Sequence, residues 1–151
     1  MVKSSLFLFC FLSACFGSKN SKKQAPEPIQ ILVENHNVAN NLERQWMLVQ
    51  FKDYKKEYLA EKKASITISK DQSVSIYMGC NKGGGKIELK GDNKFQFLNT
   101  FSTEMACEDM KLESDMFMTL SSVETYKLEG HFLYLFTKSG ETVKFIAADW
   151  D

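Results

Sequence analysis

Apolar and polar side chains alternate along most of the chain after residue 44, a pattern typical of β-strands with one buried face. In ASITISK, for example, Ile66 and Ile68 fall on one side and Thr67 and Ser69 on the other. SVSIYMG repeats the pattern, and residues 70–73 between the two segments are typical of a hairpin turn. The same alternation predicts further strands at QWMLVQF, KIEL, KFQFLN, ETYKLEG, HFLYLFTKSG and ETVKFIAA.

One segment has a helical pattern instead. Leu112, Met116, Leu120 and Val123 recur every three or four residues, which places them on one side of an α-helix. The segment KDYKKEYLAEKK is dominated by charge and is predicted to be a solvated loop. A series of strands, one helix and more strands predicts a small α+β fold, a curved antiparallel sheet or open barrel with one helix packed against it.

Residues 1–14 are predicted to be a secretory signal peptide. Lys3 supplies a positive charge, and the apolar run at residues 6–12 is too short to cross a bilayer permanently. Residues 12–15, LSAC, resemble a bacterial lipobox, in which the cysteine is acylated and becomes the first residue of the mature protein. The resemblance implies a lipid anchor at Cys15 with the membrane as its partner, and Phe16 after it implies the outer membrane of the cell envelope.

Residues 15–41 form a predicted flexible tether between this anchor and the folded domain. The stretch after the anchor is polar and basic, contains both prolines of the chain and offers no apolar pattern from which a core could be built. Residues 29–44 are ambiguous, because their apolar spacings fit both a strand and a weak helix. The domain itself is predicted to cover residues 42–148.

The charge balance argues against nucleic acid as a partner. The chain has 19 basic and 19 acidic residues and a formal net charge of zero. Binding to a phosphate backbone depends on an excess of lysine and arginine, which this composition lacks. A nucleic-acid partner is therefore not expected. Separately, no cofactor is predicted, because no cofactor-binding motif is recognised in the chain.

The segment YMGCNKGGGK, residues 77–86, is the main candidate for chemistry. A phosphate-binding loop is excluded because Cys80 stands where its first glycine belongs and Ile87 where its hydroxyl residue belongs. Zinc is disfavoured because neither Cys80 nor Cys107 has a second ligand nearby in the sequence, so no metal site is expected. A disulfide between Cys80 and Cys107 is favoured over two unpaired thiols, because the signal peptide directs the chain to an oxidising compartment.

The motifs around these cysteines resemble those of the META, or HslJ-like, domain family. They are Gly79-Cys80-Asn81 followed by glycines, and Thr103-x-Met105-Ala106-Cys107. The likeness runs from Trp46-x-Leu48 to Leu133-x-Leu135 and covers residues 42–148. It implies a small β-rich domain with a helix, carried by envelope lipoproteins and associated with stress, and it supplies no catalytic residues.

The same motifs provide the candidate binding residues, which are Gly79, Asn81, Gly84, Gly85, Thr103 and Met105. The glycines among them are interpreted first as turn residues that permit a positive φ. We therefore expect a noncatalytic module that holds an envelope protein or a small ligand, in a stress-related or envelope-maintenance role. The alternative is a cell-envelope hydrolase with a carboxylate site, for which Glu104, Glu108 and Asp109 are the acidic group closest to the motifs.

Overall fold

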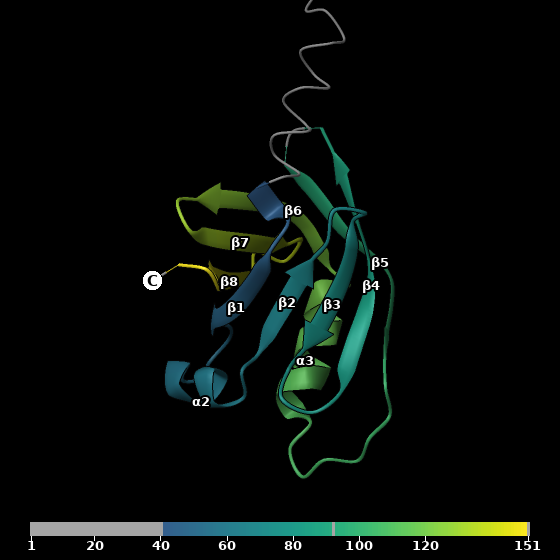
Figure 1. The fold of residues 1–151 in the computed structure, drawn as a ribbon, viewed down its shortest axis with the longest axis vertical. Helices are drawn as coiled ribbons and strands as arrows, with labels where there is room; N and C mark the ends of the chain where they lie inside the picture. Colours follow the sequence, from purple (N-terminus) through teal and green to yellow (C-terminus); the bar gives the residue numbers. More distant parts are fainter. Residues whose placement is uncertain (1–40, 92, 151) are drawn as a thin grey trace, which may run out of the picture.

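The domain is a closed barrel of eight antiparallel strands in sequence order (Figure 1). A computed structural model describes residues 41–91 and 93–150, so Cys15 and the predicted signal peptide and tether up to residue 40 lie outside the described residues. The strands are β1 (Gln45–Gln50), β2 (Ser65–Ile68), β3 (Ser73–Tyr77), β4 (Lys82–Lys90), β5 (Lys94–Ser102), β6 (Val123–Glu129), β7 (Phe132–Thr137) and β8 (Thr142–Ala147). The predicted curved antiparallel sheet is thus closed into a barrel, and the fold is mostly β.

The barrel closes because β1 pairs on both sides. Trp46 lies opposite Ile66 of β2 and opposite Ala147 of β8. Alternate residues point inward, as the sequence pattern predicts, and Leu133 of β7 and Phe145 of β8 are completely buried. The core therefore lies inside the barrel.

The predicted helix is α3 (Lys111–Leu120), and it buries the predicted apolar stripe up to Leu120, whereas Val123 of that stripe is the first residue of β6. Leu112, Met116 and Leu120 are almost completely buried, which shows that this face of the helix is part of the core. Phe117 on the same helix reaches Gly83 of β4. Within residues 41–91 and 93–150, no helix is long and apolar enough to cross a membrane.

A second helix, α2 (Lys56–Glu61), replaces the loop predicted from the charged segment, so the expectation of one helix is wrong. Leu59 is fully buried, whereas the charged residues around it are exposed. Tyr54 and Tyr58 pack partly against the core and stack on each other. Burial of Leu59 beside these rings stabilises a short helix that its charges obscure in the sequence.

The glycine run at residues 83–85 lies inside β4 and forms no turn, which corrects the interpretation of Gly84 and Gly85. Neither residue has a positive φ. The reason for glycine is close approach. A Cβ atom on Gly84 would lie 3.0 Å from the Phe101 ring, and one on Gly85 would lie 2.8 Å from the Leu98 carbonyl oxygen.

Candidate functional site

Asn81 connects the two motif segments that are separated along the chain. Its side chain is buried, and its Oδ1 accepts hydrogen bonds from the Thr103 hydroxyl and the Met105 backbone N–H, both at 2.8 Å. Its Nδ2 donates to the Met105 carbonyl oxygen at 3.2 Å. One amide thus fixes both ends of the segment 103–105, and we call this arrangement the Asn81 clasp.

Glu113 ties the clasp to α3. Its carboxylate is buried with the residue 5% exposed, and Oε2 accepts a hydrogen bond from the Asn81 backbone N–H at 2.9 Å. This role of Glu113 was not predicted from the sequence. The available signal was an acidic residue next to Leu112, on the apolar side of the predicted helix, where a carboxylate needs an internal partner.

The two motif cysteines lie at disulfide-bonding distance. The Cα atoms of Cys80 and Cys107 are 6.3 Å apart, which agrees with the predicted pairing. Gly79 before them has φ 104°, so the prediction of a turn glycine is confirmed at this position. The Lys62 side chain covers Gly79 and leaves no room for a Cβ atom.

Four of the six predicted binding residues therefore come together. Gly79, Asn81, Thr103 and Met105 lie around the clasp, whereas Gly84 and Gly85 lie further along β4. The polar groups of Asn81 bind the protein itself, while the Met105 side chain is 60% exposed. The clasp thus holds a segment in place and presents apolar surface beside it.

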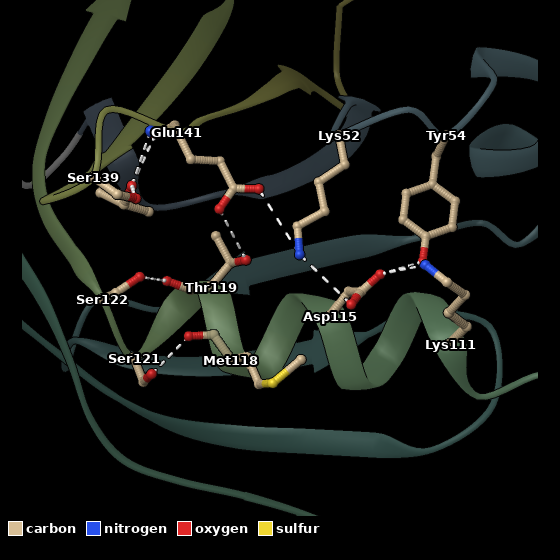
Figure 2. A network of polar contacts seen from close by, with 11 residues as sticks. Lys52, Tyr54, Lys111, Asp115, Met118, Thr119, Ser121, Ser122, Ser139 and Glu141 are labelled. Atoms are coloured by element: carbon tan, nitrogen blue, oxygen red, sulfur yellow. Dashed lines mark hydrogen bonds and ion pairs between the residues drawn. The ribbon is translucent and has the colours of Figure 1, made fainter.

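A polar network joins α3 to the segment that precedes α2 (Figure 2). Asp115 accepts hydrogen bonds from the Tyr54 hydroxyl at 2.6 Å and from Lys111 Nζ at 2.8 Å. Lys52 Nζ lies 3.5 Å from the same carboxylate and 3.9 Å from Glu141. The Lys111 hydrogen bond first, and then Tyr54, lower the pKa of Asp115 to about 2.

Tyr58 makes a second link at the same end of the barrel. Its hydroxyl donates to Asp109 Oδ2 at 2.5 Å, and Lys62 Nζ lies 3.8 Å from the same oxygen. Burial, followed by the bond to Asp109, raises the pKa of Tyr58 to about 12. Asp109 thus forms a structural contact, and Glu104 and Glu108 of the carboxylate hypothesis are exposed.

Comparisons with solved structures relate the barrel to proteins of low sequence identity. A protein from Burkholderia xenovorans is 20% identical with a TM-score of 0.59, and the match covers 89% of this chain and 99% of that one. A protein of the DUF4847 family from Bacteroides vulgatus ATCC 8482 is 14% identical with a TM-score of 0.52, over 73% of this chain and 96% of that one. These similarities concern the fold alone.

The sequence itself carries the family assignment. No curated protein matches the chain. The model of the META domain, however, matches residues 39–150, which include the Asn81 clasp, both cysteines and all eight strands. The chain belongs to the META domain family.

Proposed function

We propose that the protein is a noncatalytic binding module, tethered to the bacterial outer membrane through acylated Cys15. Its binding surface is the segment 100–106 beside the Asn81 clasp. The resemblance to envelope lipoproteins supports a role in envelope maintenance under stress. The partner is an envelope protein that recognises exposed apolar side chains, or a small ligand.

The observation that carries this proposal is the exposure of large apolar side chains on a fixed segment. Phe101 is 66% exposed and Met105 is 60% exposed. The two residues lie four positions apart on one segment, and contiguous exposed apolar surface is typical of interaction sites. Because Asn81 and the cysteine pair hold the segment in one conformation, little entropy is lost when a partner binds.

Photo-crosslinking in the native envelope tests the binding surface. A photo-reactive phenylalanine derivative at position 101 or 105 is expected to give a discrete crosslinked species. The matched control is the same substitution at Trp150, which follows the last strand and lies outside the segment 100–106. Trp150 is 57% exposed, and its ring stacks on that of His131. Crosslinks of equal yield at all three positions, or at none of them, would contradict the proposal.

The anchor is tested separately by Cys15→Ser. The unmodified chain is expected in the membrane fraction with a mass that includes acyl chains on Cys15. The variant is expected to lose the acyl mass and to leave the membrane fraction, because several acyl chains are needed for lasting attachment. Membrane retention of the unacylated variant would show that another part of the chain binds the membrane.

A further inference from the structure

A groove on the outer face of the barrel crosses the first four strands. Its volume is about 410 Å³, which falls within the ~300–1,000 Å³ range of small-molecule sites. It is lined by Gln45, Lys63, Ser65, Thr67, Ser75, Ile76, Tyr77, Lys82 and Gly83. The groove could not be predicted from the sequence, because these residues come together only when the strands pair.

The groove is hollow because one row of paired residues is small in its middle, at Thr67, Ser75 and Gly84. Gln45 lies opposite Thr67, Thr67 opposite Ser75, and Ser75 opposite Gly84. Residues directly opposite each other on neighbouring strands share a face. The row ends at Phe101, which lies opposite Gly84 and whose ring covers it.

The floor of the groove contains hydroxyl groups that make no hydrogen bond within the described part of the chain. Within residues 41–91 and 93–150, the hydroxyls of Thr67, Ser75 and Tyr77 make no hydrogen bond to another residue. Ser65 receives only a long contact of 3.4 Å from Gln45. Hydroxyl groups donate and accept, so this floor suits a ligand that does both.

The rim is positively charged. Lys63 and Lys82 form no ion pair with any residue of the described part of the chain, and no acidic residue lines the groove. Lys63 has φ 52° because it ends α2 in a Schellman motif, in which its N–H donates to the Ala60 carbonyl oxygen and the Ala64 N–H donates to that of Leu59. Two lysines without carboxylate partners beside a lining without acidic residues make this rim attractive to an anion.

We infer that this groove binds an acidic carbohydrate, a sugar chain that carries carboxylates. Sugar hydroxyls match the hydroxyl floor, and carboxylates match Lys63 and Lys82. The apolar faces of sugar rings pack on the rings of Tyr77 and Phe101. Lysine attracts carboxylate and phosphate alike, so the match between sugar hydroxyls and the hydroxyl floor is what favours a carbohydrate. The inference goes beyond the proposed function, because the groove lies on β1–β4 and the segment 100–106 borders it at Phe101.

Isothermal titration of the full chain in detergent with a tetramer of galacturonic acid tests this inference. Binding is expected to weaken as salt rises, and the neutral tetramer maltotetraose is expected to bind at least about 10-fold more weakly. The double variant Lys63→Gln/Lys82→Gln is expected to lose about 10-fold or more in affinity for the acidic tetramer. Thr67→Val, which replaces the hydroxyl with a methyl group of similar size, is expected to weaken the binding of both sugars.

The matched control is Lys56→Gln/Lys138→Gln, which makes the same change in net charge at exposed positions away from the groove. It is expected to retain the affinity of the unmodified chain. No binding of the acidic tetramer, equal binding of the neutral one, or equal binding of inorganic phosphate would overturn the inference. Crosslinks at positions 101 and 105 without carbohydrate binding would leave the proposed function intact, so the two failures are distinguishable.

Discussion

Asn81 shows that a residue of the Gly79-Cys80-Asn81 motif can have a structural role without any ligand. Its backbone N–H binds Glu113, and its amide binds Thr103 and Met105, so the residue ties its own strand end to two other parts of the chain. A buried amide costs free energy unless its groups are paired, and here they are. The motif therefore has a structural role that is independent of binding.

Asn81→Ala is expected to lower the free energy of unfolding by about 2–4 kcal/mol, because Thr103 and Met105 lose their partners as well. Urea denaturation measures the change. Gln96→Ala on exposed β5 is the control and should stay within about 0.5 kcal/mol of the unmodified chain. A loss below about 1 kcal/mol for Asn81→Ala would show that water replaces the clasp.

The sequence was informative about which residues matter here and less so about how they act. The cysteine count and the signal peptide predicted the Cys80–Cys107 pairing, and the distance between them agrees. The motifs placed Asn81 and Thr103 among the important residues. The hydrogen bond between their side chains could not be predicted, because the sequence does not show which way a side chain points.

The contact between α3 and β4 depends on glycine at position 83, which leaves room for the Phe117 ring. A Cβ atom on Gly83 would collide with the Phe117 ring and would lie 2.8 Å from the Phe101 carbonyl oxygen. Gly83→Ala is therefore expected to cost about 1–3 kcal/mol of stability, as overpacking typically does. The double variant Gly83→Ala/Phe117→Leu should recover part of that loss in urea denaturation, which identifies the ring as one cause. Additive losses would contradict this explanation.

The network on α3 predicts a stability change in acid. The pKa of Asp115 falls from 3.8 to about 2 on folding, so its ionised form stabilises the folded protein above about pH 4. This contribution is lost as the pH falls from about 4 to about 2. Asp115→Asn should therefore be less stable than the unmodified chain at neutral pH, and the difference should shrink across this window.

Urea midpoints between pH 2 and 7 measure this effect. Glu129→Gln, which breaks an exposed ion pair with Lys127, is the control and should shift the midpoints little. A constant difference between Asp115→Asn and the unmodified chain across the window would show that Asp115 acts by packing alone.

The helix α2 and the first part of β4 were not predicted from the sequence, for reasons that the structure shows. α2 buries Leu59 but is surrounded by lysine and glutamate, so its helical preference is hidden by its charge. Residues 83–85 have poor strand propensity, yet β3 and β5 on either side keep them extended. In both cases tertiary contacts, and not the local sequence pattern, determine the secondary structure.

At the scale of the whole molecule, the strands were predictable but their closure was not. The alternating pattern marks all eight strands approximately, and the helical stripe marks α3. Closure depends on the pairing of β1 with β8, between the two ends of the domain. No local pattern reports such a pairing, so the sequence supports a curved sheet and an open barrel equally.

The cysteine pair should stabilise the whole domain. A disulfide that joins residues 27 positions apart contributes ~3 to 4 kcal/mol by restricting the unfolded chain. The oxidised protein is expected to lose about this much when a thiol reductant is added, as measured by urea denaturation. The variant Cys80→Ala/Cys107→Ala should be insensitive to reductant. Equal stability with and without reductant in the unmodified chain would contradict the prediction.

The order of the strands also has a consequence for the folding of the chain. Each strand pairs with its neighbour in sequence, except where Trp46 of β1 meets Ala147 of β8. Hairpins between sequence neighbours form from nearby contacts, whereas this last pairing must bring together the two ends and bears the largest loop-closure entropy. We expect the ring to close after the rate-limiting step, so that weakening the β1–β8 pairing accelerates unfolding and leaves the refolding rate almost unchanged.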